Sequence, residues 1–496
     1  MSCEIIERLE QWRSRFDPSG AVGLEGLLAA VAREGFPGAE DLIRLHETLL
    51  FLRAYPLSKK VARLADRILF AFANRTAADG DLDPFEEPEV SGIAGTSLTV
   101  VFSYEVARCL AALHPRHIEI GWDRYEEQDR LGPVVRRLLP MLNEDWPVEA
   151  HVPFQEWIAA AHSRASSDLQ WLLKHVTDAD RYDSLQLPLT WKMGASRDSR
   201  SRLRLPVSNL YLHREPLLRR SAVSLERDLA GPAIPVRLLA RPEARRILDV
   251  TLATSAMRYR ELYGFSHPDE AGVYHAEAGR GVDIYFFGVP PEWRLPLRAY
   301  HAGMFFKNGV PAGYVELLSL FERAEVGFNL YYTFREGESA WLYARLLRLF
   351  HQELGVTCFS VDPYQIGQEN AEAVDSGAFW FYRKLGFRPT DPEVARLVGR
   401  EEGRMRKTPG YRSSKRTLEK LAKGYMLYEM PGTGSGDWDQ FRIRTLAQRL
   451  QQGGSAERRV VREIGKAKQS GAESRYLRWM QGDARLREML VKWGQG

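Results

Sequence analysis

One short segment combines an arginine, small residues and the start of a helix in an order that suits anion binding. It covers residues 334–340, between an expected strand and a helix expected to begin near Ser339. A turn that leads from a strand into a helix exposes backbone N–H groups and the positive end of the helix dipole. The segment therefore predicts a phosphate-binding turn, formed by Phe334, Arg335, Gly337, Glu338, Ser339 and Ala340.

The sequence on either side of this turn predicts the elements that must hold it. Residues 326–334 predict a strand whose successive side chains alternate between two faces. From Ser339, apolar residues recur at helical spacing until Gly355, and glycine commonly ends a helix. The apolar residues 356–361 predict the next strand.

A β-hairpin is expected upstream of the turn. Two apolar runs, at 299–306 and 312–321, flank the pair Asn308 and Gly309. Asn-Gly between apolar runs is a strong hairpin signal. Further strands are predicted at 272–276 and 282–287 from their alternating or continuous apolar character.

A second motif follows the strand expected at 356–361. It consists of Asn370 and the run Phe-Tyr-Arg-Lys-Leu-Gly-Phe at residues 381–387. Together with the hairpin and the turn before Ser339, this motif resembles the GNAT superfamily of CoA-dependent N-acyltransferases. The resemblance implies an α+β fold with a mixed, mainly antiparallel sheet flanked by helices.

The resemblance also implies roles for the turn. The family's diphosphate-binding turn has the form Gln/Arg-x-x-Gly-x-Gly/Ala, and Gly337 and Ser339 fall on its small positions; Phe334 leads, with Arg335 displaced by one residue. By this resemblance Gly337 admits the diphosphate, Ser339 caps the helix and Arg335 adds a charge-assisted contact. Asn370 would contact the cofactor or the strand end. The implied co-substrate is acetyl-CoA or another acyl-CoA; the alternative is an ordinary strand-to-helix turn with an exposed arginine.

Three further residues are candidates for proton transfer. Tyr382 falls where many family members place a tyrosine that protonates the leaving CoA thiolate, and a phenol stays protonated at neutral pH. Tyr382 is also one of four consecutive aromatic residues, so a core position is the alternative. The attacking amine needs a base, and Glu316 and Glu325 are the candidates. Glu316 shares a strand face with apolar residues, where a carboxylate needs a partner or a function.

The length of 496 residues predicts several domains. We expect a helix-rich domain at 1–235, the acyltransferase domain at 236–432 and a basic helical tail at 433–496. In the first of these, a glycine-containing turn at 91–96 is expected to open an apolar helix that runs through Val101 and Val106.

Charge is distributed unevenly along the chain. Residues 400–496 contain 22 Lys or Arg against 11 Asp or Glu, although the formal net charge of the chain is only +4. Such a tail could contact RNA or a carrier protein, or dock on the more acidic remainder of the chain. Three scattered cysteines favour neither a disulfide framework nor a metal site. The sequence lacks a long apolar run and a signal-peptide pattern, so we expect a cytoplasmic protein without a membrane partner.

The sequence thus favours an N-acyltransferase that transfers an acyl group, with acetyl expected, from a CoA thioester to a small-molecule or peptide amine. Two alternatives stay open. The donor could instead be an aminoacyl-tRNA or an acyl-carrier protein, as the basic tail suggests. The domain could also be a non-catalytic module for binding or assembly, and self-association is compatible with either.

Overall fold

The computed structural model describes residues 2–33, 38–77, 83–139, 152–163, 165–194, 197–295, 298–320, 322–433 and 448. The described chain is a mixed α+β protein that divides into two compact units. Unit 1 comprises Met1–Pro216, Arg245–Ser266 and Asn308–Pro311, and unit 2 comprises Leu217–Ala244, His267–Lys307 and Ala312–Gly496. The basic tail predicted at 433–496 lies outside the described residues, apart from Thr433 and Gln448.

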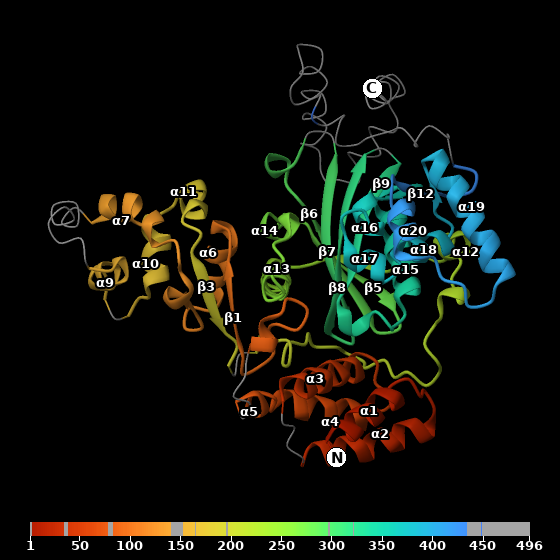
Figure 1. Cartoon of the computed structure of the whole chain (residues 1–496), viewed down its shortest axis with the longest axis horizontal. Coiled ribbons are helices and arrows are strands. Elements are labelled where there is room, and N and C mark those ends of the chain that lie inside the picture. The colour runs from red at the N-terminus through yellow and green to blue at the C-terminus, as the bar shows by residue number, and fades with distance from the viewer. Residues whose placement is uncertain are drawn as a thin grey trace, which may run out of the picture. The chain divides into compact units, whose positions relative to one another are not determined.

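Unit 1 begins with four helices that pack on one another (Figure 1). They are α1 (Ser2–Trp12), α2 (Pro18–Val31), α3 (Ala39–Ala54) and α4 (Lys59–Phe70). Two of them begin at side-chain caps: Asp17 accepts a 2.7 Å hydrogen bond from the Gly20 amide, and Ser58 accepts one of 3.1 Å from the Val61 amide. Such caps satisfy N–H groups that a helix leaves without an internal partner.

The second part of unit 1 is built on a small antiparallel sheet. Its strands β1 (Ser97–Val101), β2 (Ile118–Ile120) and β3 (Pro188–Lys192) lie in the order β1-β3-β2. Residues 97–101 therefore form a strand, and the expectation that a helix begins directly after the turn at 91–96 was wrong. The sequence Ser-Leu-Thr-Val-Val is rich in β-branched residues, which favour strands. The expected helix, α6 (Tyr104–Leu113), begins only at Tyr104.

Short helices complete this part of unit 1 and bury a shared apolar core with the three strands. The other described α-helices of the unit are α5 (Ala73–Thr76), α7 (Gly132–Leu138), α9 (Phe154–Ala160), α10 (Asp168–His175), α11 (Ala179–Ser184), α14 (Tyr263–Ser266), and the greater part of α13 (Arg241–Ala256).

A fully buried network of polar side chains lies within unit 1. Arg200 donates two 2.9 Å hydrogen bonds to the Glu47 carboxylate, whose Oε1 lies 3.0 Å from Nδ1 of His46. His46 Nε2 lies 2.9 Å from Ser201 Oγ, and burial lowers the pKa of His46 to about 4. Hydrogen bonds link a serine to a histidine and the histidine to a glutamate, the order found in a hydrolase triad. Ser201 is fully buried, however, and its hydroxyl accepts a hydrogen bond from the Ala94 amide, so the network has a structural role.

The Arg200→Met variant tests that role. Removing one member of a buried ion pair leaves an uncompensated charge, here the Glu47 carboxylate. We expect the free energy of unfolding of unit 1 to fall by about 3 kcal/mol. Denaturant unfolding of the full chain measures this value, with Arg197→Met at an exposed position as the matched control. Equal stability of the two variants would contradict the structural role.

Unit 2 is organised on a nine-stranded sheet with the order β11-β12-β10-β9-β8-β7-β6-β5-β4. The predicted hairpin is confirmed, and Asn308 and Gly309 adopt positive φ angles of 48° and 78° at its turn. The strands are β4 (Val236–Leu238), β5 (Val273–Gly279), β6 (Val282–Gly288), β7 (Ala299–Lys307), β8 (Val310–Leu320), β9 (Arg323–Leu330), β10 (Cys358–Val361), β11 (Arg388–Pro389) and β12 (Met426–Glu429).

Strands β9 and β10 run parallel and then part. Their pairing begins at Cys358 with Arg323 and ends at Ser360 with Glu325, whereas β9 continues to Leu330 and stays paired with β8 along its whole length. Beyond Glu325, the second edge of β9 has no strand partner among the described residues. The strand predicted at 326–334 thus begins three residues earlier and ends at Leu330, because the chain then enters the 3₁₀ turn η6 (Tyr332–Phe334).

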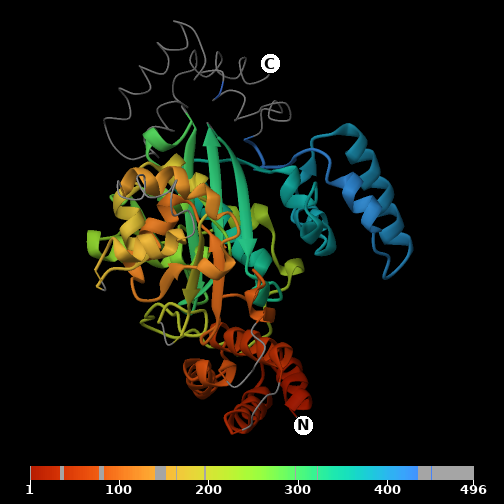
Figure 2. The same cartoon turned by 60° about the vertical axis from the view of Figure 1, so that its left-hand side comes forward.

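Helix α15 (Ser339–Leu354) follows this turn and confirms the predicted helix. Gly355 ends it in the left-handed conformation, with φ of 70°. Figures 1 and 2 show the helices of unit 2 beyond β10 gathered together. They are α16 (Pro363–Ile366), α17 (Ala371–Asp375), α18 (Ala378–Lys384), α19 (Pro392–Lys407) and α20 (Lys415–Leu421), with α12 (Leu225–Leu229) earlier in the unit. Within the described ranges, no helix is both long and apolar enough to cross a lipid bilayer.

Candidate functional site

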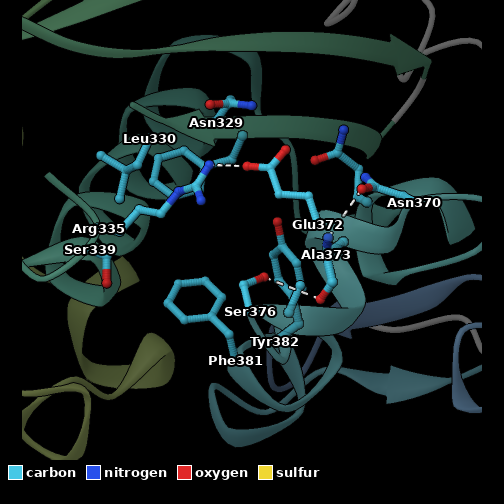
Figure 3. Close-up of a pocket in the computed structure, with 13 residues that line it drawn as sticks. Asn329, Leu330, Arg335, Ser339, Asn370, Glu372, Ala373, Ser376, Phe381 and Tyr382 are labelled. Atoms are coloured by element: carbon cyan, nitrogen blue, oxygen red, sulfur yellow. Dashed lines mark hydrogen bonds and ion pairs between the residues drawn. The ribbon is translucent and has the colours of Figure 1, made fainter. Parts of the chain in front are cut away.

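A cavity of about 220 Å³ lies where β9 and β10 part (Figure 3). Its walls come from the end of β9, the start of α15 and the helices α16 to α18. In parallel arrangements, ligands bind at the carboxyl ends of the strands, and this cavity lies at such a place. The described lining residues are Phe328, Asn329, Leu330, Arg335, Ser339, Gln365, Asn370, Glu372, Ala373, Ser376, Ala378, Phe381 and Tyr382.

The cavity therefore brings together four of the residues predicted from the sequence, namely Arg335, Ser339, Asn370 and Tyr382. One of them, Arg335, forms an ion pair with another lining residue, Glu372, across the cavity. Arg335 also lies over the ring of Tyr332, at 5.8 Å from the ring centroid. Because Arg335 and Glu372 are the only charged residues in the described lining, the wall carries no net charge.

Tyr382 lines the cavity. Figure 3 shows its hydroxyl pointing into the open space, and among the described residues no group is hydrogen-bonded to it. Its ring is packed edge to face against Tyr343 at 5.5 Å and Phe387 at 5.6 Å. Burial raises the pKa of the Tyr382 phenol, so the hydroxyl stays protonated at neutral pH. Tyr382 is thus a core aromatic residue whose protonated hydroxyl faces the cavity.

The turn at 334–340 offers fewer free amides than the sequence suggested. The Gly337 amide donates a 2.9 Å hydrogen bond to the Phe334 carbonyl, and the Phe334 side chain is buried. Ser339 does not cap α15, because Glu338 occupies the cap position and makes no side-chain capping bond. The N–H groups of the first helical turn, which include those of Ser339 and Ala340, remain the groups available to an anion.

Asn370 has local partners for its side chain. Its Oδ1 accepts a 3.1 Å hydrogen bond from the Ala373 amide, which caps α17, and its Nδ2 donates to the Tyr364 carbonyl at 3.1 Å. The residue shapes the wall of the cavity and holds the loop after β10. Contact with a ligand, as the resemblance implied, would be an additional role.

Glu316 in β8 and Glu325 in β9 are absent from the described cavity lining. The register pairs Tyr314 with Asn329 and Glu316 with Gly327, so these residues share one face of the sheet with Glu325. Asn329 on that face lines the cavity. A Cβ placed on Gly327 would lie 3.7 Å from Nε2 of Gln365, another lining residue, and 3.9 Å from the Glu316 Cβ. The Glu316 carboxylate accepts a hydrogen bond from Tyr300.

Glu338 points into a different, buried cluster. Its carboxylate accepts hydrogen bonds from Arg280 at 2.5 and 3.0 Å and from the Leu218 amide at 3.0 Å. The ammonium group of Lys307 lies 3.6 Å from the same carboxylate and donates a 2.5 Å hydrogen bond to the Arg280 carbonyl. Glu338 therefore anchors the start of α15 rather than contributing its side chain to the cavity.

Several residues of the cavity could not be identified from the sequence motifs. Gln365, Glu372 and Ser376 stand between Asp362 and the run at 381–387 and belong to no recognisable spacing. Their position after β10 is the signal that could have found them, because residues that follow neighbouring parallel strands meet at one edge of a sheet. Within the described ranges, no three His, Cys, Asp or Glu side chains lie close enough together to hold a metal ion.

Comparisons with protein-family models, with curated proteins and with solved structures found no match for this chain.

The Lys307→Met variant tests the anchor of α15. Burial lowers the pKa of Lys307 to about 7, Glu338 opposes this change, and Arg280 adds to it. Between about pH 7 and the ordinary lysine pKa near 10.5, the unfolded chain binds more protons at this residue than the folded chain. The free energy of unfolding therefore rises with pH across this window, by up to about 1.4 kcal/mol per pH unit from Lys307. Below the folded-state pKa, Lys307 is protonated in both states and contributes no pH dependence.

We expect Lys307→Met to remove this rise. Denaturant unfolding at about pH 8 and pH 10 measures it, with the exposed Lys423→Met as control. A pH slope that is the same in both variants would show that Lys307 is not buried as an anchor.

Proposed function

We propose that unit 2 is an N-acyltransferase that moves an acyl group from a pantetheine thioester, such as acetyl-CoA, to an amine. The observation that supports this most strongly is the parting of β9 and β10 beside a cavity that Tyr382 lines. The order of the elements, from the hairpin through the turn before α15 to the run at 381–387, fits the resemblance to the GNAT superfamily. The same order fits an α+β fold with one parallel pair in a mainly antiparallel sheet.

The free edge of β9 suits the donor's arm. Pantetheine contains two amide groups separated by short chains, and an extended amide chain can pair with an exposed strand edge as an added strand. Residues 326–330 of β9 have that edge available after Glu325. Asn329, Gln365 and Ser376 add side-chain polar groups along the same cavity.

The two ends of the cavity suit the two ends of the arm. The start of α15 presents N–H groups near Arg335 and Ser339, where the phosphate end of the arm would lie. The apolar end near Phe328, Phe381 and Tyr382 would receive the thioester. A phosphate at Arg335 competes with Glu372, which now holds that guanidinium.

The chemistry needs one acid and one base. The amine nitrogen attacks the thioester carbonyl, the carbon–sulfur bond breaks, and the thiolate takes a proton from the Tyr382 hydroxyl. The attacking amine loses its proton to a carboxylate, for which Glu316 and Glu325 are the candidates on the sheet face that carries Asn329. Product release and proton exchange with water restore both groups.

Donor binding is the first test of this proposal. We expect acetyl-CoA to bind the full chain, and we expect Ser376→Phe to abolish the binding because the added ring fills the cavity. Titration calorimetry measures both, and Asp375→Phe, next in sequence but outside the described cavity lining, is the control. Unchanged acetyl-CoA binding by Ser376→Phe would place the donor elsewhere.

The acid role of Tyr382 is tested by removing only its hydroxyl. We expect Tyr382→Phe to lower the turnover of acetyl-CoA with an amine acceptor by about 100-fold while donor affinity changes little. Tyr343→Phe is the matched control, because that neighbouring hydroxyl is also buried and has no hydrogen-bond partner in the described part of the chain. The control should turn over normally and be equally or more stable, since an unpaired buried hydroxyl is costly. Full turnover by Tyr382→Phe would exclude the acid role.

A further inference from the structure

A basic surface covers α19, α20 and the segment that joins them. All ten of the Lys and Arg side chains between residues 392 and 423 are exposed. We define the basic surface by these side chains: Arg396, Arg400, Arg404, Arg406, Lys407, Arg412, Lys415, Arg416, Lys420 and Lys423.

Few carboxylates oppose these cations. Residues 392–423 contain four Glu and no Asp, against these ten cations. Glu401 is buried and accepts hydrogen bonds from Tyr411 and Ser413 as well as Arg404, while Glu402 binds Arg383. Only Glu393 and Glu419 are exposed. The outer face of α19 and α20 is therefore strongly positive.

Part of the surface forms a stripe along one face of α19. Arg396, Arg400, Arg404 and Lys407 are spaced by four, four and three residues, so at 100° per residue they fall within a narrow sector of the helix. The stripe extends over about 16 Å at 1.5 Å per residue. Like charges at this spacing destabilise a helix slightly. A stripe of this kind is more easily explained by an anionic partner than by the stability of the helix.

Positive charges also lie close together where the basic surface adjoins the end of α18. The pKa of Lys384 at the end of α18 is lowered by burial and further by its neighbours Arg220 and Arg412. The positive potential of the basic surface therefore extends to the helix that carries Tyr382 and Phe381.

The basic surface adjoins the helices that form the cavity. Helix α20 packs against α17, and Lys415 lies 3.2 Å from Asp375, the residue before Ser376. The indole of Trp380 donates a 3.2 Å hydrogen bond to Ser413 in the segment between α19 and α20. Figure 2 shows α19 and α20 on the side of α17 and α18 that faces away from the sheet.

The cavity itself offers little positive charge to a free diphosphate. Arg335 is held by Glu372, the described wall carries no net charge, and Arg280 and Lys307 are turned toward Glu338. The cations available to a donor are thus concentrated on the adjoining surface rather than in the cavity.

We propose that the basic surface docks an acidic carrier protein, which presents its acyl group on a phosphopantetheine arm to the cavity. This inference rests on the proposed acyltransferase function and specifies its donor. A carrier protein has the same pantetheine thioester as acyl-CoA but replaces the nucleotide diphosphate with an acidic protein surface. RNA would match the charge, but an aminoacyl-tRNA donates from an ester and has no pantetheine arm to occupy the cavity.

Charge reversal on the stripe tests the inference. The Arg400→Glu/Lys407→Glu variant changes two exposed side chains that have no ion pair within the described residues. Lys59→Glu/Arg63→Glu, also exposed and four residues apart on a helix, is the matched control in unit 1. The probes are an acidic acyl carrier protein loaded with acetyl, acetyl-CoA and bulk tRNA, each titrated into the full chain.

We expect the stripe variant to weaken carrier binding at least tenfold, to leave acetyl-CoA binding unchanged, and to match the wild type in thermal unfolding. Carrier affinity of the wild type should also fall between about 50 and 300 mM salt, because screening weakens contacts between exposed charges. The control variant should bind all probes as the wild type does.

The possible outcomes separate the two proposals. Binding of acetyl-CoA without the carrier, or carrier binding that the stripe variant leaves unchanged, would overturn the carrier inference and leave the acyltransferase proposal standing. Binding of tRNA that is lost in the stripe variant, without carrier binding, would show an RNA surface and likewise overturn it. Absence of binding of both thioesters would count against the acyltransferase proposal itself.

Discussion

The separation of two parallel strands determines what the rest of unit 2 can do. Backbone N–H and C=O groups in a sheet require partners, and β9 has lost its partner on one edge after Glu325 while β8 still holds the other edge. Pairing with β8 therefore holds β9 in place, while the backbone groups on its other edge are available for hydrogen bonds. The cavity, the start of α15 and the Tyr382 hydroxyl all lie around this opening. On the proposed function, an extended chain with its own amide groups would pair with this edge as an added strand.

Charges in unit 2 are arranged so that the rigid parts and the binding parts are separate. Arg280 and Lys307 are placed against Glu338, and this buried cluster fixes the residue that precedes α15. Arg335 and Glu372 neutralise each other at the cavity, and their ion pair would have to open for Arg335 to bind an anion. The exposed cations are gathered on α19 and α20, beyond the helices that form the cavity wall. On the proposed function, this separation would place recognition of a large anionic partner outside the cavity and acyl transfer inside it.

Local signals in the sequence predicted the local elements well. Asn308 and Gly309 specified the hairpin, and Ser339 and Gly355 marked the two ends of α15, because each acts through its own backbone conformation or its neighbours. The strand at 97–101 was missed because the glycine-containing turn before it also suits a helix start. The end of β9 at Leu330 depends on where β10 departs, and a sequence pattern of alternating side chains continues past that point.

The site was predictable only in part, because some of its residues come together only through the path of the folded chain. Arg335, Ser339, Asn370 and Tyr382 belong to motifs and were found, and the structure brings them to one cavity. Glu338 belongs to the same motif, but its partners are Arg280 in the turn between β5 and β6 and Lys307 at the end of β7, so its anchoring role depends on the fold. Gln365, Glu372 and Ser376 line the cavity only because the chain turns back after β10. Their types alone carry no signal.

Hydrogen–deuterium exchange of the full chain tests the central claim most directly, because it reports on the backbone amides of β9 themselves. The account predicts that acetyl-CoA, or the acetyl carrier protein, slows exchange at residues 326–330 and in the first turn of α15, while β4 and β5 are unaffected. If a bound thioester protects other segments and leaves the exchange of 326–330 unchanged, the parted strands do not hold the donor and the account is wrong.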